Sequence, residues 1–400
     1  MSRKLLNYKK NEQYSELFFG LSDIRLSDYV KNYSGPVIVY DLEVIRERVR
    51  WVQRWPQLGK LHYAVKANFN LEILKLLKSL NCGADVVSVG EIKRAFAAGF
   101  LPQDIIFSGV GKSREELKWA IENNIYQINA ESLSEIRKIS EIAKKIGKKV
   151  QLGLRINPEI DAETHPSIST ALKDSKFGLD FDSGRSAAQM ISEDRFLELK
   201  ALSFHLGSQI MNTQVFEKAL SVMKPYYKSI QAVCPELERF DLGGGIGIDY
   251  QDADNDTDRE RWQNLQSVFE RDLKDFKAFY LLEIGRFLVA RSGVLLSRVE
   301  ILKETSTKKF MILDVGMTHI MRPALYGAYH HILPLVKRSE ELYRYDVVGP
   351  ICESTDVLAE GRNISPVQEE DFVAICDVGA YGSVMASRYN LRDEATEVVI

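Results

Sequence analysis

Short apolar runs alternate with amphipathic stretches over more than half of this 400-residue chain, from about residue 60 to residue 285. Eight runs have the length and composition of buried strands: 61–65, 84–88, 104–108, 126–129, 151–156, 201–206, 239–242 and 280–284. Between them, apolar residues recur at helical spacing, and Ser113 with Glu116 forms a capping box that marks a helix start. This alternation predicts an α/β fold, a (β/α)8 barrel. A doubly wound open sheet is the alternative, because periodicity alone does not prove that a sheet closes.

The pattern changes after Arg286. Five β-rich runs follow, separated by Gly, Pro and charged turns, at 293–304, 309–316, 345–350, 371–379 and 396–400. We therefore predict two domains. The barrel is expected over residues 36–286, and residues 287–400 form a C-terminal all-β domain to which residues 1–35 are added.

The composition is that of an ordinary globular protein, with 45% hydrophobic and 27% charged residues. A net charge of -3 gives no electrostatic reason to expect nucleic acid or an anionic membrane as a partner. The first residues lack the apolar core of a signal peptide, and no run is long enough to span a membrane. Four scattered cysteines form no CxxC pair, so we expect a cytoplasmic protein.

Three motifs are weaker than they look. GVGKS at 109–113 ends like a phosphate-binding loop, but Ile106 stands where that motif needs its first glycine. GGGIGI at 243–248 starts like a dinucleotide fingerprint, but its third glycine is replaced by Ile248. The adjacent histidines 330 and 331 diverge on any regular element, so we expect ordinary, partly exposed side chains and no metal site.

The carboxyl ends of barrel strands form the catalytic face of such folds. In this sequence, several residues suited to catalysis or ligand binding lie at these ends. They are Lys66, Asp85, His205, Gly243, Gly244, Gly245 and Glu283. Taken singly, each has an ordinary explanation: Lys66 reaches solvent, His205 is a core histidine, and the glycines make a tight turn. Their common location favours a joint function.

Together they offer what pyridoxal phosphate requires of a protein. A lysine amine forms a Schiff base with a carbonyl, and consecutive glycines let backbone N–H groups approach a phosphate. A buried carboxylate at Glu283 holds a pyridine nitrogen protonated, while His205 stacks on the ring. The strand ends therefore predict a pyridoxal phosphate site.

Several motifs carry a resemblance to a known family. They are HYAVKAN (62–68), HLGSQI (205–210), DLGGGIG (241–247), EIGR (283–286), RPALY (322–326), GPICESTD (349–356) and GAYG (379–382). In this order they resemble the alanine-racemase-like, fold type III pyridoxal phosphate decarboxylases. Residues 156–179 and 321–330 resemble the branch that acts on diaminopimelate more than its ornithine-specific relatives. The likeness spans nearly the whole chain.

The resemblance implies a role for each matching residue. Lys66 would bind the cofactor covalently, His205 would lie against its ring, and Glu283 would pair with its nitrogen. The other implied cofactor-binding residues are Asp85, Ser208, Gly243, Gly244, Gly245, Ile284, Gly285, Arg286 and Tyr381. Ile284 departs from the family, which has proline here, and restores a backbone N–H donor.

The resemblance also implies substrate-binding residues. Arg286, Arg322 and Tyr326 would hold the substrate carboxylate distant from the reacting carbon, Glu353 the distant ammonium, and Tyr381 both substrate and cofactor. Cys352 would return a proton after carbon dioxide leaves. These C-terminal residues would complete the site across a head-to-tail homodimer.

The implied reaction converts meso-2,6-diaminopimelate to L-lysine and carbon dioxide. A decarboxylase of another basic amino acid (D-lysine, D-ornithine, ornithine or arginine) is the nearest alternative. Those substrates lack a second carboxylate, which Arg322 would otherwise meet. A non-catalytic regulator on the same fold is a third alternative, and it would be expected to have lost Lys66 and Cys352.

Overall fold

A computed structural model describes residues 4–161, 175–252 and 255–400. The chain divides into two compact units. The β unit contains residues 1–48, 248–259 and 286–400, and the barrel unit contains residues 49–247 and 260–285.

The barrel unit is built on eight parallel strands that close in the order β10-β11-β12-β5-β6-β7-β8-β9. Their bounds are β5 Leu58–Ala64, β6 Gly83–Val86, β7 Ile105–Phe107, β8 Gln127–Ala130, β9 Val150–Arg155, β10 Leu197–Ser203, β11 Arg239–Asp241 and β12 Phe279–Ile284. β12 pairs with β5 and thereby closes the ring, with Glu283 opposite His62. The predicted barrel is confirmed, and the open sheet is excluded.

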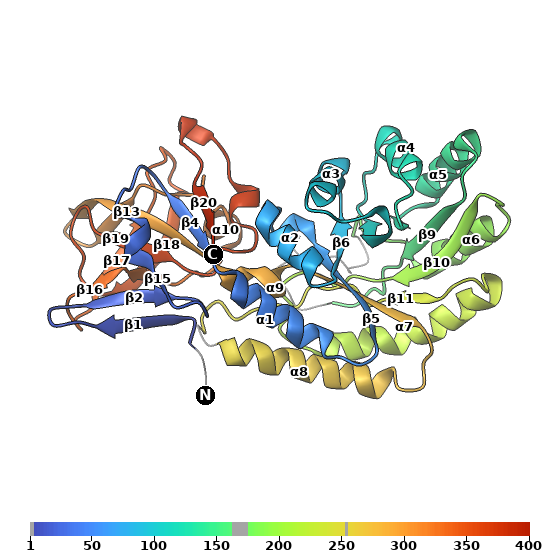
Figure 1. Ribbon diagram of the computed structural model, residues 1–400, viewed down its shortest axis with the longest axis horizontal. Coiled ribbons are helices and arrows are strands. Elements are labelled where there is room, and N and C mark those ends of the chain that lie inside the picture. The colour runs from blue at the N-terminus through green and yellow to red at the C-terminus, as the bar shows by residue number, and fades with distance from the viewer. Residues whose placement is uncertain (1–3, 162–174, 253–254) are drawn as a thin grey trace. The chain divides into compact units, whose positions relative to one another are not determined.

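Helices follow the strands as their apolar spacing predicts (Figure 1). Their bounds are α1 Leu42–Gln53, α2 Leu71–Ser79, α3 Val89–Ala97, α4 Arg114–Glu122, α5 Leu133–Ile146, α6 Phe181–Ser192, α7 Gln214–Val233 and α8 Asn255–Asp272. The capping box at the start of α4 is present, because Ser113 Oγ accepts from the Glu116 N–H and Glu116 accepts from the Ser113 N–H. Ser88 and Ser132 cap α3 and α5 in a similar way.

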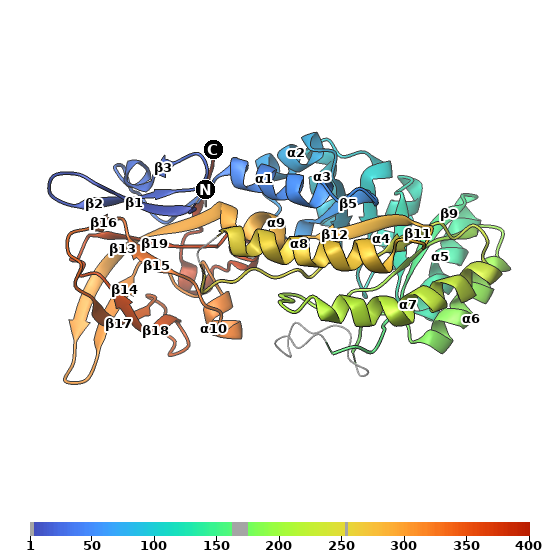
Figure 2. The same ribbon diagram turned by 90° about the horizontal axis from the view of Figure 1, so that it is seen from below.

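The β unit contains two sheets and short helices (Figure 2). One sheet joins β1 Leu6–Lys10, β2 Ser15–Phe19, β3 Ile24–Arg25 and β16 Val336–Lys337. The other joins β4 Val37–Tyr40, β13 Gly293–Glu304, β14 Lys309–Leu313, β15 Ile332–Pro334, β17 Tyr343–Val348, β18 Val357–Ile364, β19 Phe372–Ile375 and β20 Thr396–Val399. Leu17 and Phe19 of the first sheet pack with Val294, Leu296 and Ala374 of the second in a common core. Two short helices, α9 Arg286–Val289 and α10 Arg322–Tyr326, lie in this unit.

The division between the units differs from the predicted boundary at residue 36. Strand β4 pairs with β13 and β20, and residues 1–48 belong to the β unit. Residues 248–259 also belong to it, although they lie between two barrel strands in the sequence.

A buried ionic network attaches residues 248–259 to the rest of the β unit. Asp258 accepts hydrogen bonds from Arg48, at 2.7 Å, and from Arg291, at 2.9 Å. Arg291 also pairs with Asp377 at 3.1 Å and donates to the carbonyl groups of Asp249 and Asp252. Because each charge in the network has an opposite neighbour, its burial is tolerated.

Candidate active site

Lys66 lies where strand β5 gives way to a short 3₁₀ turn, Val65–Ala67. Its side chain is exposed, and the Tyr63 hydroxyl closes the turn by donating to the carbonyl of Asn68 at 2.9 Å. Burial raises the pKa of Asp85 on the neighbouring strand β6, and the nearby Lys66 ammonium opposes that rise. The lysine therefore stands beside an acid at the carboxyl ends of two adjacent strands.

Three carboxyl groups meet inside the barrel: Asp85, Asp241 and Glu283. Burial, with the charges of Asp241 and Asp85, raises the pKa of Glu283 well above its ordinary value. Burial likewise raises the pKa of Asp241 to about 6. One buried oxygen of Asp85 and one of Asp241 have no hydrogen-bond partner among the described residues. Like charges so close disfavour full ionisation, so the cluster favours sharing a proton with a basic nitrogen.

A chain of polar side chains supports Glu283 from within the barrel. Asn129 Nδ2 donates to Glu283 Oε1 at 3.3 Å, and Gln127 Nε2 donates to Asn129 Oδ1 at 2.8 Å. Gln127 Oε1 in turn accepts from Arg239 at 3.2 Å. A Cβ at Gly153 would lie 2.1 Å from Asn129 Oδ1, so only glycine leaves room for this chain. The donors fix which amide atom of Asn129 faces Glu283.

The glycine loop after β11 provides space and orients His205. A Cβ on Gly244 would lie 1.8 Å from the Glu283 carbonyl oxygen, and one on Gly245 would lie 2.0 Å from the Gly207 carbonyl oxygen. Gly243 and Gly245 also have positive φ angles of 67° and 88°, which glycine adopts readily. The Gly244 N–H donates to His205 Nδ1 at 3.3 Å, and the Gly243 N–H donates to Asp241.

His205 is therefore held as an acceptor, two residues beyond the end of β10. Burial, together with the charges of Lys66 and Arg155, keeps its pKa well below the ordinary value. A neutral imidazole in a fixed orientation suits stacking against an aromatic ring. Ser208 lies in the same loop, which is joined to the glycine loop by a bridge between Ile210 and Ile246.

Two further predicted residues, Ile284 and Gly285, lie at the carboxyl end of β12. Ile284 is the last residue of β12 and is buried opposite Tyr63. A Cβ on Gly285 would lie 2.9 Å from that of Ala67, so the chain passes close to the turn that carries Lys66. A lysine, a buried carboxyl cluster and a glycine-lined loop at the barrel strand ends fit pyridoxal phosphate.

The β unit holds a separate cluster of two arginines and three rings. Arg286 Nη1 donates to the Tyr250 hydroxyl at 2.9 Å, and its guanidinium lies 4.7 Å from the Tyr381 ring centre. The Arg322 guanidinium lies 4.2 Å from the centre of the Tyr250 ring and donates to His330 Nε2 at 2.8 Å. Both arginines are buried, at 7% and 5% exposure. Two desolvated cations so placed are suited to an anion.

Of the remaining predicted substrate residues, Tyr326 lies near the arginine cluster, whereas Cys352 and Glu353 do not bond to it in the described part of the chain. Tyr326 ends α10 and is close enough to Arg286 to raise the pKa of that arginine, an effect that burial opposes. Cys352 and Glu353 are both exposed on the loop between β17 and β18. The Cys352 N–H donates to Asn390 Oδ1, and Glu353 accepts from the Thr355 hydroxyl. Among the described residues, neither bonds to the arginine cluster.

The prediction for His330 is wrong. Its side chain is 1% exposed and makes two hydrogen bonds, whereas His331 is partly exposed. The two side chains do diverge, but one of them is held in the interior by Arg322 and the Cys376 carbonyl group. Tyr250, Asn129 and Asp241 were not singled out, because a lone polar residue beside an apolar run carries no distinctive spacing.

GVGKS is a strand-to-helix turn, as predicted. Lys112 is buried there, pairs with Glu135 at 2.8 Å and donates to two backbone carbonyl groups. Its amine is therefore occupied by the protein. Of the motif at 156–179, residues 162–174 lie outside the described part of the chain.

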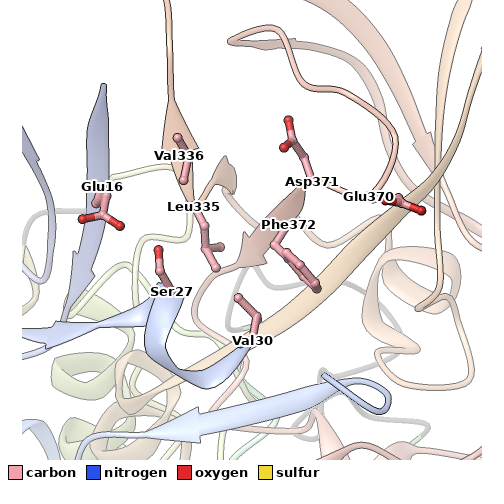
Figure 3. Close-up of a pocket in the computed structure, with 8 residues that line it drawn as sticks. All are labelled: Glu16, Ser27, Val30, Leu335, Val336, Glu370, Asp371 and Phe372. Carbon is pink, nitrogen blue, oxygen red and sulfur yellow. The ribbon is translucent and has the colours of Figure 1, made fainter. Parts of the chain in front are cut away.

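A cavity of about 180 Å³ in the β unit lies among residues that were not predicted to act (Figure 3). It is lined by Glu16, Ser27, Val30, Leu335, Val336, Glu370, Asp371 and Phe372. Glu16 pairs with Arg25 and Asp371 with Arg338. In the described ranges, no group of three His, Cys, Asp or Glu side chains could hold a metal ion, and no helix is long and apolar enough to cross a membrane.

The barrel and its lysine define a class of protein, and comparison with known proteins agrees. Residues 42–290 match the family model described as pyridoxal-dependent decarboxylase, pyridoxal binding domain. The chain is a pyridoxal phosphate-dependent decarboxylase of the alanine-racemase-like fold.

Similarity over the full length narrows the class. The chain is 36% identical to the diaminopimelate decarboxylase of Aquifex aeolicus, over 99% of this chain and 94% of the relative. It is 39% identical to that of Zymomonas mobilis, over 95% and 91% of the two chains. The crystal structure of the Helicobacter pylori enzyme complexed with L-lysine is 37% identical and matches with a TM-score of 0.88 over 94% of this chain and 93% of that one. The chain belongs to the diaminopimelate decarboxylase family.

Proposed function

We propose that the chain catalyses the pyridoxal phosphate-dependent decarboxylation of meso-2,6-diaminopimelate to L-lysine and carbon dioxide. The observation that carries the substrate assignment is the pair of buried arginines, Arg286 and Arg322, which both contact Tyr250. A second carboxylate distinguishes diaminopimelate from lysine, ornithine and arginine, and a forked guanidinium is suited to bind it. The L-lysine complex of the Helicobacter relative supports the same class of ligand.

The barrel residues prepare the cofactor and manage protons. Lys66 would hold the cofactor covalently, and its free amine would act as a base beside Asp85. Glu283 would pair with the ring nitrogen of the cofactor, and Asn129 Nδ2 keeps that carboxyl group in place. Pyridoxal phosphate, when bound, supplies the electron sink for the pair of electrons left by the departing carbon dioxide. His205 would support the ring face, and the loops with Gly245 and Ser208 would hold the phosphate.

The substrate residues select the second amino-acid group. Arg286, Arg322 and Tyr326 bind its carboxylate, Glu353 binds its ammonium, and Tyr381 contacts substrate and cofactor. Cys352 delivers a proton to the carbon that has lost carbon dioxide. A substrate that lacks one charged end leaves buried site groups unpaired, which can cost up to about four orders of magnitude in selectivity.

We expect carbon dioxide release from meso-diaminopimelate to exceed that from lysine, ornithine and arginine, in either enantiomer, by at least about 10³-fold in kcat/KM. The reason is that these three compounds have no second carboxylate to meet Arg286 and Arg322. Release of labelled carbon dioxide by the purified protein measures the ratio. Preference for ornithine or arginine would contradict the substrate assignment.

We also propose a homodimer in which Cys352 and Glu353 of one protomer serve the barrel of its partner. Both residues are exposed in the isolated chain, as expected for groups that act on another protomer. The Lys66→Ala and Cys352→Ala variants should each be nearly inactive alone.

Co-expressed with different affinity tags, these two variants should recover about a quarter of the wild-type activity. Half of the dimers formed at random are mixed, and each mixed dimer has one intact site. Size-exclusion chromatography with light scattering measures the assembly. The absence of recovery from isolated mixed dimers would place Lys66 and Cys352 in the same protomer's site.

A further inference from the structure

His330 is held by two hydrogen bonds whose directions determine its protonation. Its Nδ1 lies 2.7 Å from the carbonyl oxygen of Cys376, and its Nε2 lies 2.8 Å from Nη1 of Arg322. A carbonyl oxygen only accepts and a guanidinium only donates. Nδ1 therefore carries the proton, and Nε2 is an acceptor. Burial and the charge of Arg322 keep the pKa of His330 well below its ordinary value, in agreement with a neutral ring.

This arrangement orients Arg322 without neutralising it. The His330 nitrogen takes one N–H group at the guanidinium edge, and the Tyr250 ring covers one face at 4.2 Å. Tyr250 also contacts His330 edge-on, with 5.3 Å between ring centres. Among the described residues, no carboxylate lies within the 4.0 Å ion-pair distance of Arg322. A carboxylate in place of His330 would bind the same edge of the Arg322 guanidinium, but it would also neutralise the positive charge of that guanidinium.

We propose that His330 is a positioning residue that holds Arg322, as a full cation, in the orientation that binds the distant carboxylate of the substrate. The inference rests on the proposed function, because Arg322 binds that carboxylate only if the substrate has one. His330 thereby determines affinity for a carboxylate without touching the substrate. Its effect should fall on binding and not on the chemical step.

The test compares two ligands that differ only in that carboxylate, L-lysine and cadaverine, on the cofactor-containing enzyme. His330→Leu removes the acceptor for Arg322. The dissociation constant of L-lysine, measured by calorimetry, and the KM for meso-diaminopimelate should therefore both rise about 10- to 100-fold. We expect kcat to change less than about threefold, since the reacting carbon is not involved. Cadaverine binding and the absorbance of the bound cofactor should stay as in the wild type.

Two variants serve as controls. His330→Gln offers an amide oxygen to Arg322 and an N–H group to the Cys376 carbonyl, so it should restore most of the affinity for L-lysine. His331→Leu changes the neighbouring histidine, which bonds to the Gln251 carbonyl, and should leave L-lysine binding unchanged.

Unchanged L-lysine affinity in His330→Leu would overturn the proposal, as would equal weakening of L-lysine and cadaverine. If His330→Leu does not fold, nitrogen-15 NMR of the histidine-labelled wild-type enzyme tests the proposal instead. An unprotonated Nε2 that shifts on addition of L-lysine supports the inference, and a doubly protonated or lysine-insensitive ring rejects it. Failure of the proposed function is a different result: the wild-type enzyme would then not act on meso-diaminopimelate.

Discussion

Replacement of Lys66 by alanine is expected to lower the decarboxylation rate about 10⁴-fold, because one residue supplies both a covalent bond and a positioned amine base. Lys66 is the exposed residue of the turn after β5, beside Asp85. Its side chain is exposed, so the variant should fold and still bind the cofactor weakly.

Borohydride reduction followed by peptide mass spectrometry measures the covalent bond directly. Reduction fixes the cofactor to the lysine amine as a stable mass label. This label should appear on the peptide that contains Lys66 in the wild type and be absent from Lys66→Ala. Lys75→Ala is the matched control, since Lys75 is an exposed lysine of α2 whose contact is a surface pair with Glu72. Label on another lysine, or activity within tenfold of the wild type, would contradict the assignment.

Replacement of Arg291 by methionine should lower the free energy of unfolding by about 3–5 kcal/mol. The side chain is 1% exposed, and its loss leaves the buried Asp377 without its cation. It also removes the hydrogen bonds that Arg291 donates to the carbonyl groups of Asp249 and Asp252. Urea denaturation followed by circular dichroism, at a fixed cofactor concentration, measures the loss.

Two comparisons separate charge burial from simple loss of packing. Arg388→Met removes an arginine of the β unit that is 72% exposed and paired with Glu394, and it should cost less than about 1 kcal/mol. Asp377→Asn added to Arg291→Met should recover part of the stability, because the uncompensated charge is then gone. A loss in Arg291→Met no larger than that in Arg388→Met would show that the network contributes nothing.

The barrel could be predicted because its strands and helices are defined by local periodicity. All eight predicted runs overlap an observed strand, and the capping box at Ser113 marks the start of α4. The β unit was less predictable. Strand β18 contains the polar residues Glu360, Arg362 and Asn363, so it lacks the apolar run from which a strand is predicted. Strand β4 pairs with strands that are distant in sequence, and no local pattern predicts such a pairing.

The candidate site was partly predictable for the same reason. Lys66, His205 and Glu283 stand at strand ends, where a barrel places its chemistry. Their orientation depends on Asn129 and the Gly244 N–H group, and that of the two buried arginines depends on Tyr250 and His330. Most of these contacts join residues far apart in the sequence, and no local pattern encodes them.

The pairing of β4 sets the order in which the protein can be completed during synthesis. The Tyr40 hydroxyl bonds to Glu397, 357 residues further along, and β20 pairs with β4 over its whole length. At ribosomal rates of about 5–20 residues per second, β4 waits roughly 20 to 70 s for this neighbour. Through that interval its edge is open to other chains, so we expect the nascent protein to depend on chaperones more than the finished one does.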